Sequence, residues 1–460
     1  MTSFAQPQSF FKDLRGESRT EEQNKVLLVA NTGWYLYNFR LSLAEELRER
    51  GASVVFVSPW DPYVEKIKAE GFWWIELDLN RRSTNPFIEL RTVFRLLLIY
   101  LVESPTIVHH FTIKCVLYGT LAAKLSRTQN VVNAITGLGY IFINNSIKAR
   151  LLRLIVQPLY FFTLNARRCR VVVQNQDDLN LLVDRKLVAP EKLSLIRSSG
   201  VNLQKFNPSL LQSKGSQSKG SQSKGSQSKN SEKGSSQENI GGQKNSEIED
   251  NISAIARQRD NRSVTILLAS RIVGDKGVYE YIEAARNLQA KGHKAVFKMA
   301  GALYPGNPSA VSEEEVEQWE MDGVVEWLGH VDNMTEVIAE ADIVVLPSHG
   351  GEGVPKILIE AAAMAKPLVA TDVPGCRDAV DSGRNGFLVP AKSVDLLSTA
   401  MEQLIEDAAL RQKMGAEGRK KAEAEFDVRC VIAKTLEIYE EMHPIRAVSY
   451  EDNRRMVTSI

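Results

Sequence analysis

The chain has few cysteines, and none of them lie close together. Its 460 residues include only Cys115, Cys169, Cys376 and Cys430. Zinc sites and redox motifs usually begin with two cysteines about two to four residues apart, so the sequence indicates neither. Scattered thiols are typical of a reducing compartment. We therefore expect a cytoplasmic protein, or one that lies peripherally on the cytoplasmic face of a membrane.

Long apolar runs and an excess of charge are missing as well. No stretch offers the roughly 18 uncharged apolar residues of a membrane-spanning helix, and the N-terminal residues lack the apolar core of a secretory signal. The net charge of +1 gives no argument for a nucleic-acid partner. Residues 86–102 and 148–170 are apolar with basic residues among or around them. Each fits either a helix packed on a sheet or a helix lying in a membrane interface.

Several catalytic signatures are absent from the sequence. There is no Asp-x-Asp pair, His-Glu-x-x-His, Gly-x-Ser-x-Gly or P-loop. We therefore expect no metal and no other cofactor. The Gly-Leu-Gly at 137–139 lacks the third glycine of a dinucleotide-binding turn and does not follow the first strand. A nicotinamide-dependent dehydrogenase is accordingly the weakest of the readings that we considered.

Short apolar runs alternate with helical patterns in both halves of the chain, which predicts parallel sheets buried on both faces. The predicted strands are 25–30, 53–59, 106–111, 130–135, 170–175, 193–198, 263–270, 295–301, 324–331, 342–348, 367–372 and 387–390. Helical patterns include 40–51, 277–292, 334–341 and 354–365. The predicted fold is α/β, with two doubly wound Rossmann-like domains facing a central cleft.

A low-complexity segment separates the two halves. It repeats a five-residue unit of Gln, Ser, Lys and Gly, which has no apolar side chain to bury and predicts a flexible insertion. The predicted organisation follows from this boundary: a disordered arm (1–23), a first Rossmann-like domain (24–206), the insertion (207–261), a second Rossmann-like domain (262–426), and a C-terminal helix with a tail that returns toward the first domain (427–460).

Ligands of such sheets bind at the carboxyl ends of the strands, so the turns after strands are the candidate sites. One turn places Arg271 and Lys276 around a glycine loop, where two cations could hold a diphosphate. A merely basic, solvated loop is the alternative. Another turn leads through HGGEG into a helix with Pro355 at its start, where exposed N–H groups attract anions. The candidate anion-binding residues of this turn are Gly353, Val354, Pro355 and Lys356.

Two carboxylates accompany this second turn. Glu352 precedes the helix and Glu360 lies two turns further on, and carboxylates are good acceptors for sugar and ribose hydroxyls. The alternative makes Glu352 a charge that balances the helix dipole and Glu360 a surface residue. In the first half, Gly33 follows the first strand, where the backbone could approach a phosphate or a sugar. Further candidates for acceptor or sugar contacts end later strands: His109, His110, Thr136 and Gly137.

The order of these turns resembles that of the retaining glycosyltransferases of family 4, which have the GT-B fold. The likeness is carried by RIVGDKG, MAG, WLGHV, ADIVVLPS, EGVPKILIEA and TDVPGCRDAV, by the E-x7-E spacing of Glu352 and Glu360, and by SSGVNLQKFNP at 198–208. TGWYLYNFR, HHFTIK and NAITGLGY resemble a sub-branch that includes bacterial enzymes extending undecaprenyl-diphosphate-linked sugars. One such member adds N-acetylgalactosamine to a lipid-linked bacillosamine derivative.

The resemblance implies that the first domain (24–206) binds the acceptor and the second (262–426) binds the nucleotide sugar, and it implies a role for each candidate residue. Arg271 and Lys276 would hold the donor diphosphate, Glu352 would contact the donor sugar and act with them in catalysis, and Glu360 would bind the ribose. Gly33 would line the phosphate side of the cleft. The partners implied are a nucleotide sugar, first of all UDP-N-acetylhexosamine, and a glycan or polyprenyl-linked acceptor. Transfer would keep the anomeric configuration without a metal.

The chain departs from the family pattern at one strand end. Where many members carry His-x-His, this chain has His109, His110 and Phe111, so the second histidine of the pattern falls on Phe111. Two alternatives stay open: a nucleotide-sugar epimerase of the same fold, and a non-catalytic nucleotide-sugar-binding protein. The E-x7-E spacing argues against the first, and the intact set of charged residues argues against the second.

Overall fold

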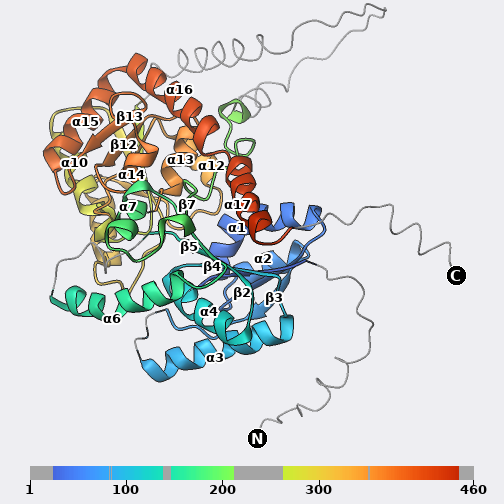
Figure 1. Ribbon diagram of the computed structural model, residues 1–460. Helices are drawn as coiled ribbons and strands as arrows, with labels where there is room; N and C mark the ends of the chain where they lie inside the picture. The colour runs from blue at the N-terminus through green and yellow to red at the C-terminus, as the bar shows by residue number, and fades with distance from the viewer. Residues whose placement is uncertain are drawn as a thin grey trace, which may run out of the picture. The chain divides into compact units, whose positions relative to one another are not determined.

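The computed structural model describes residues 24–81, 83, 85–137, 147–211, 263–350 and 353–444. The predicted arm, nearly all of the predicted insertion and Glu352 lie outside these residues. The described residues form the α/β fold that was predicted, with two open sheets and helices in the crossovers between strands (Figure 1).

The first sheet has seven strands in the order β3-β2-β1-β4-β5-β6-β7. They are β1 (Lys25–Val29), β2 (Ser53–Ser58), β3 (Trp73–Glu76), β4 (Ile107–Phe111), β5 (Asn130–Ile135), β6 (Cys169–Val173) and β7 (Leu193–Leu195). β1 pairs in parallel with β2 on one side and with β4 on the other, where Leu27 is opposite Val55 and Val108. This central place explains the continuous apolar run of β1, because both of its faces are buried.

The helices between these strands are α1 (Gly33–Glu49), α2 (Tyr63–Ala69), α3 (Pro86–Glu103), α4 (Ile113–Ser126), α6 (Ile147–Leu164) and α7 (Gln176–Asp184). The prediction placed the start of the first helix at residue 40, seven residues too late. Thr32 is the N-cap, and its side chain accepts a hydrogen bond from the Tyr35 N–H at 3.1 Å. This cap lets the helix begin soon after β1, so residues 33–39, which precede the predicted helical pattern, form its first two turns.

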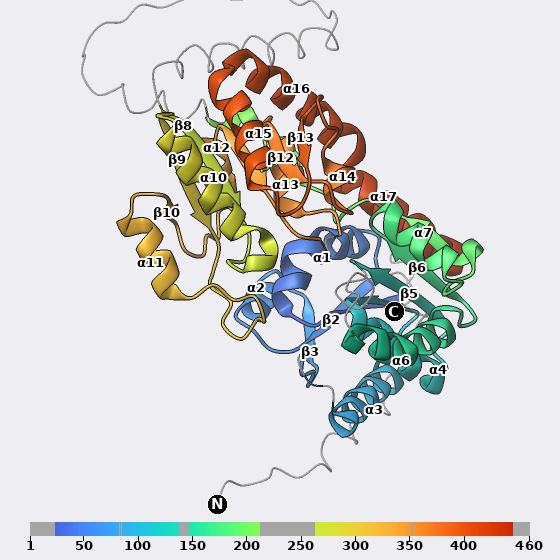
Figure 2. The same cartoon turned by 90° about the vertical axis from the view of Figure 1, so that its left-hand side faces the viewer.

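The second sheet has six strands in the order β10-β9-β8-β11-β12-β13, and every neighbouring pair is parallel. Its strands are β8 (Val264–Ala269), β9 (Ala295–Ala300), β10 (Glu326–Trp327), β11 (Ile343–Leu346), β12 (Leu368–Thr371) and β13 (Gly386–Val389). Its helices are α10 (Val278–Ala290), α11 (Glu313–Met321), α12 (Met334–Glu340), α13 (Lys356–Ala363), α14 (Cys376–Ala379), α15 (Val394–Glu406), α16 (Ala408–Glu425) and α17 (Val428–Met442). Figure 2 shows them from a second side.

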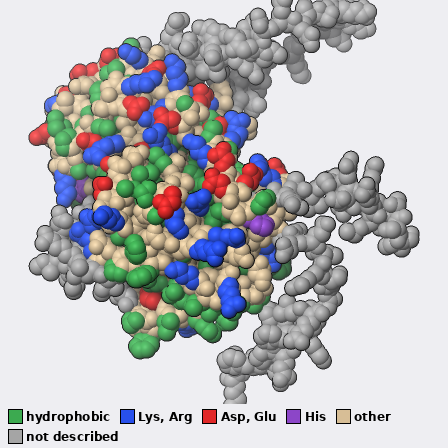
Figure 3. Space-filling view, viewed as in Figure 1, with side chains coloured by type: hydrophobic (Ala, Val, Ile, Leu, Met, Phe, Trp, Pro, Cys, Tyr) green, Lys and Arg blue, Asp and Glu red, His purple; other side chains and the backbone are tan. Residues whose placement is uncertain are grey.

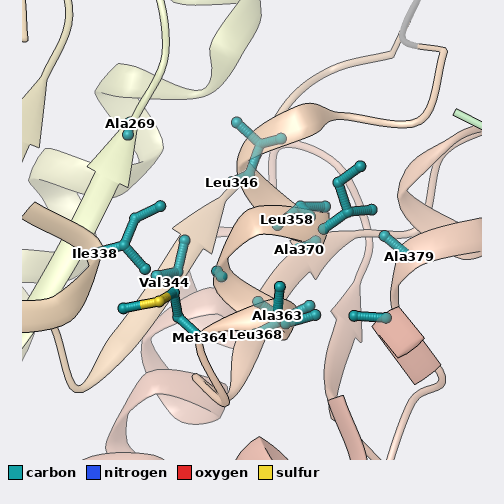
Figure 4. Close-up of a cluster of buried hydrophobic side chains, with 14 of the residues drawn as sticks. Ala269, Ile338, Val344, Leu346, Leu358, Ala363, Met364, Leu368, Ala370 and Ala379 are labelled. Atoms are coloured by element: carbon teal, nitrogen blue, oxygen red, sulfur yellow. The ribbon is translucent and has the colours of Figure 1, made fainter. Parts of the chain in front are cut away.

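The central strands of the second sheet contribute to two cores, one on each face. In β11, Val344 and Leu346 join the cluster drawn in Figure 4, with residues of α12, α13 and α16, while Ile343 and Val345 join the cluster with residues of α10, α11 and α15. Alternate side chains of a strand point to opposite faces, so both sets must be apolar. This packing holds the carboxyl ends of β8, β11 and β12 at one edge.

By the density of internal contacts, the chain divides into two compact units. The first holds Met1–Asn133, Ala166–Cys169 and Glu437–Ile460, and the second holds Ala134–Asn165 and Arg170–Leu436. The second unit therefore includes the whole six-stranded sheet and the last strand of the first sheet. The predicted domain boundaries stay a prediction.

Among the described residues, no helix is long and apolar enough to cross a membrane. Of the two apolar stretches singled out in the sequence, one is α3 and the other contains most of α6. The side chains in the first turns of α6 lie outside the described set. Near its C-terminal end, Phe161 and Phe162 are exposed.

Candidate active site

Two loops at the edge of the six-stranded sheet are tied together by backbone packing. Gly277 joins η4 (Gly274–Lys276) to α10 in the left-handed conformation, with φ of 76°. A Cβ atom at this position would overlap the carbonyl oxygen of Pro347, in the loop after β11. Beside this contact, the His349 N–H donates a hydrogen bond to the Asp275 carbonyl oxygen at 2.9 Å. The loop after β8 is thereby fixed against the loop after β11.

Arg271 and Lys276 lie close together in this fixed loop. The Arg271 guanidinium is 5.2 Å from the centre of the Tyr304 ring, and its side chain is exposed. Lys276 is half-buried, and removal from water together with the nearby Arg271 charge lowers its pKa to about 8. Arg271 therefore disfavours the charged form of Lys276, and an anion bound near both side chains would favour it.

The loop after β12 reaches the same place. Burial raises the pKa of the Cys376 thiol to about 12, and the Lys276 ammonium opposes that rise, so these two side chains are near neighbours. The Thr371 hydroxyl donates to the Ser348 carbonyl, which joins the ends of β12 and β11. Loops after three adjacent strands thus meet around Lys276, at the edge where parallel sheets bind ligands.

Glu360 is buried on α13, with only 7% of its surface exposed. Burial raises the pKa of its carboxyl, while the ammonium groups of Lys356 and Lys205 oppose that rise. The Lys356 Nζ lies 3.7 Å from the Glu360 Oε1. The interpretation of Glu360 as a surface residue is therefore wrong. A carboxylate this buried needs cations or donors around it, and Lys356 and Lys205 are the cations near it.

The start of α13 is crowded. Val354 is buried, and Pro355 is the N-cap, with Lys356 as the first helical residue. A Cβ atom at Gly353 would overlap the Gln174 amide oxygen and lie 2.7 Å from the Thr136 carbonyl oxygen. All of these residues belong to the second unit. Thr136, directly after β5, thus lies against Gly353, and Gly137 follows it with φ of 136°.

Sequence reasoning did not select Lys205, Gln174 and Cys376 as site residues. Lys205 lies in the segment 198–208 that carried part of the family resemblance, so its neighbourhood was visible in the sequence. Its approach to Glu360, which is 155 positions further along the chain, depends on the folded path. Gln174 directly follows β6 but was placed inside the predicted strand 170–175, whereas Cys376 lies in the turn after the predicted strand 367–372, where a survey of such turns would have included it.

In the first unit, the start of α1 lies against the carboxylate of Asp61. The Trp34 N–H donates to the Asp61 Oδ2 at 2.9 Å. A Cβ atom at Gly33 would lie 2.7 Å from the Asp61 Oδ1 and 2.9 Å from the Val64 Cγ2. Gly33 is thus needed for close packing between α1 and the segment that leads into α2. Its proposed part in donor binding stays a prediction.

His109 and His110 are both buried in β4. The His109 Nδ1 lies 2.6 Å from the Tyr439 hydroxyl of α17, and the His109 ring is 4.1 Å from that of Phe111, centre to centre. His110 is held between the Tyr100 hydroxyl and the Asn133 amide oxygen, each at 2.8 Å. Burial lowers the pKa of both rings, that of His110 to about 4. Both histidines are neutral at physiological pH, and their part in sugar contacts stays a prediction.

One group of potential metal ligands occurs among the described residues: His293, Glu402 and Glu406. Glu402 lies 2.8 Å from the His293 Nε2 and 2.6 Å from the Lys291 Nζ. An ammonium at this distance competes with a metal ion for the carboxylate, so the group is an ion-pair network between α15 and the end of α10.

Two parallel α/β sheets in the two halves of the chain are the architecture of the GT-B class. The chain belongs to the group 1 glycosyltransferases. Residues 251–421 match the family model described as glycosyl transferases group 1, and residues 25–175 match that of glycosyl transferase 4-like proteins. The first match includes Arg271, Lys276 and Glu360.

Two curated relatives extend this finding. The N,N'-diacetylbacillosaminyl-diphospho-undecaprenol alpha-1,3-N-acetylgalactosaminyltransferase of Campylobacter jejuni is 26% identical over 419 residues, which are 91% of this chain and 99% of the relative. The capsular polysaccharide biosynthesis glycosyltransferase CapM of Staphylococcus aureus is 22% identical over 354 residues, which are 76% of this chain and 80% of the relative.

Solved structures share the fold. HepE of Anabaena, in complex with UDP and glucose, superposes with a TM-score of 0.67 at 15% identity, over 91% of this chain and 100% of HepE. A glycosyltransferase from Rickettsia africae superposes with a TM-score of 0.64 at 19% identity, over 92% of this chain and 99% of that one. These likenesses confirm the predicted GT-B fold.

Proposed function

We propose that this glycosyltransferase moves an N-acetylhexosamine from a UDP donor to a polyprenyl-diphosphate-linked glycan, with retention, in the biosynthesis of a cell-surface polysaccharide or glycan. The observation that carries the proposal is the pair of Arg271 and Lys276 at the carboxyl edge of the second sheet. Burial and the nearby Arg271 charge lower the pKa of Lys276, so this pair presents a positive field in which a bound anion would stabilise the Lys276 ammonium. A diphosphate is the anion that such a field would hold best.

The chemistry needs that positive field most when the donor bond breaks. As the bond between the anomeric carbon and the diphosphate oxygen lengthens, negative charge grows on the leaving group. Cations already in place stabilise this charge without having to reorganise. The acceptor hydroxyl attacks from the same face, and its proton passes to an oxygen of the departing diphosphate. Retention follows from attack on that face.

The remaining site residues have proposed roles in donor binding. The Glu360 carboxylate accepts hydrogen bonds from the ribose hydroxyls, with Lys356 and Lys205 supporting its charge. Backbone N–H groups at the start of α13 face the donor, and they come from Gly353 and Lys356 on either side of Pro355. The proposed contact of Glu352 with the donor sugar rests on the family resemblance, because Glu352 lies outside the described residues.

The choice of donor and acceptor draws on the relatives. The Campylobacter enzyme is named for a diphospho-undecaprenol acceptor and for N-acetylgalactosamine, and it is similar to this chain over nearly its full length. The Staphylococcus relative is named for capsular polysaccharide biosynthesis. A UDP complex of HepE shares the fold and supports UDP as the nucleotide.

A panel of UDP-, GDP- and ADP-sugars tests the proposal, with membrane lipid extract and EDTA present. We expect labelled sugar to enter the lipid phase from a UDP donor despite the chelator. Consumption or epimerisation of the UDP-sugar without transfer would indicate the epimerase alternative. Binding of UDP-sugar without any turnover would indicate the non-catalytic alternative.

A further inference from the structure

The outer face of α3 carries an apolar stripe. Thr92, Val93, Leu96, Ile99 and Tyr100 face inward and are buried. The opposite face also consists of large apolar residues, at the spacing of three or four that places them in line along a helix. This stripe is Phe87, Leu90, Phe94, Leu98 and Leu101, which are 81%, 65%, 58%, 39% and 54% exposed. A helix on a protein surface ordinarily presents polar residues there.

The neighbouring helix α4 extends the stripe into a surface. α3 and α4 pack against each other, and both views show them side by side (Figures 1 and 2). Leu121 and Leu125 of α4 are exposed one turn apart. We call the stripe and these two leucines the α3–α4 face. Figure 3 shows hydrophobic side chains gathered at the lower end of the view, where α3 lies. Contiguous exposed apolar surface of this kind marks an interaction site.

Basic residues surround the apolar ones. Arg91 and Arg95 are exposed on α3, and Lys124 and Arg127 are exposed at the end of α4. α4 contains no acidic residue. The two carboxylates of α3 are engaged by lysines from outside the helix: Glu89 lies 2.6 Å from the Lys114 Nζ, and Glu103 lies 3.0 Å from the Lys25 Nζ. Asp78 pairs with Arg91 at 2.9 Å. The balance of charge around the α3–α4 face is therefore positive.

We propose that the α3–α4 face docks on a bilayer containing anionic lipids, with α3 lying in the plane of the headgroups. An apolar helix face flanked by arginine and lysine matches such a surface, because the apolar side chains enter the acyl boundary while the cations meet the lipid phosphates. A symmetric contact between two copies of this face would instead bring like charges together. The docking itself is argued from this face alone. Its biological role rests on the proposed function, because a polyprenyl-linked acceptor lies in a bilayer.

Sedimentation of the full chain with vesicles tests the docking without any sugar transfer. We expect the protein to pellet with vesicles of phosphatidylcholine and phosphatidylglycerol, and much less with phosphatidylcholine alone. Replacing both arginines, Arg91→Gln with Arg95→Gln, should weaken binding about thirtyfold. The double change Phe94→Glu with Leu98→Glu should weaken it by about a hundredfold or more. All four side chains are exposed on α3, so the variants are expected to fold.

Met321→Glu is the matched control, because Met321 is 74% exposed on α11, in the other unit. This variant should bind vesicles as the wild type does. The proposal would be overturned if the variant with Phe94→Glu and Leu98→Glu bound vesicles as strongly as the wild type. It would also be overturned if the wild type did not bind anionic vesicles. A concentration-dependent dimer abolished by those two changes, with no vesicle binding, would also overturn it and assign the face to a second copy.

Transfer to a detergent-solubilised acceptor separates this proposal from the proposed function. If docking alone is lost, the variant with Phe94→Glu and Leu98→Glu keeps transfer in detergent and loses it with vesicles. If wild-type protein binds anionic vesicles but transfers no sugar to any lipid, the docking surface stands and the proposed acceptor is wrong.

Discussion

Gly277 and Pro347 approach so closely that no side chain fits between them. A Cβ atom at Gly277 would overlap the Pro347 carbonyl oxygen, and the φ of 76° at Gly277 is itself unfavourable for any other residue. This contact sets the position of Lys276, the neighbouring residue. The geometry of the cationic pair therefore depends on a glycine that bears no functional group.

The change Gly277→Ala tests that dependence. We expect lower thermal stability and weaker UDP binding, measured by thermal unfolding and calorimetry. Gly292→Ala is the matched control: Gly292 has φ of 86°, and nothing lies within 4 Å of a Cβ atom there. The control should lose about 1–2 kcal/mol for the left-handed backbone alone. Gly277→Ala should lose about 1–3 kcal/mol more for the overlap. Equal losses and unchanged UDP binding would contradict the account.

Proton uptake should accompany UDP binding near pH 8. Lys276 has a pKa of about 8 in the free protein, so about half of the molecules carry the ammonium at that pH. A bound diphosphate raises this pKa, and the protein then takes up about half a proton. Calorimetry in two buffers of different ionisation enthalpy measures the uptake. Because UDP binding takes up a proton, UDP affinity should fall as pH rises above 8.

The matched variants are Lys276→Arg and Lys291→Arg. Arginine stays charged throughout this range, so Lys276→Arg should bind UDP without proton uptake. Lys291 is an exposed lysine paired with Glu402, and its replacement should leave the uptake unchanged. Uptake that persists in Lys276→Arg would show that another group titrates.

The sequence was sufficient to predict the two sheets because their strands are nearly continuous apolar runs, as in KVLLV of β1 and VTILLA of β8. It was not sufficient for β3, whose Trp73 is 72% exposed and whose strand lacks a buried pattern. Among candidate residues, Arg271 and Lys276 are five positions apart and could be paired by inspection. Lys205 and Glu360 could not, because only the folded chain brings them together.

Glu360 should contribute to UDP affinity through its buried carboxylate. Glu360→Gln keeps the shape of the side chain and removes its charge. We expect UDP binding to weaken by about 1.5–3 kcal/mol, the range for a hydrogen bond to a charged group, or roughly 10- to 150-fold. Glu340→Gln is the control, because Glu340 is an exposed carboxylate on α12, 3.6 Å from the Lys298 Nζ. An unchanged dissociation constant in Glu360→Gln would remove Glu360 from the donor site.

The buried histidines should make the protein sensitive to acid. The pKa of His110 is lowered from its ordinary 6.5 to about 4, so the unfolded state binds a proton that the folded state excludes. Stability is complete above pH 6.5 and falls as pH decreases from 6.5 toward 4, by about 3 kcal/mol for this group. His109 acts in the same direction.

Thermal unfolding between pH 7.5 and 4.5 checks this sensitivity. His110→Gln should reduce the dependence on pH, whatever its absolute stability. His330→Gln, at an exposed histidine near Asp332, should leave the dependence as in wild type. The account fails for His110 if its replacement leaves the pH profile unchanged.

The central claim is that the Arg271 and Lys276 pair drives transfer from a UDP donor. The most direct measurement is kcat/KM for labelled UDP-N-acetylhexosamine, with the polyprenyl-linked acceptor and EDTA, in Arg271→Ala and Arg286→Ala. Arg286 is a partly exposed arginine of α10 paired with Glu283. We predict wild-type activity for Arg286→Ala and a loss of about 2–4 kcal/mol, roughly 30- to 900-fold, for Arg271→Ala. An unchanged kcat/KM in a folded Arg271→Ala protein would contradict the claim.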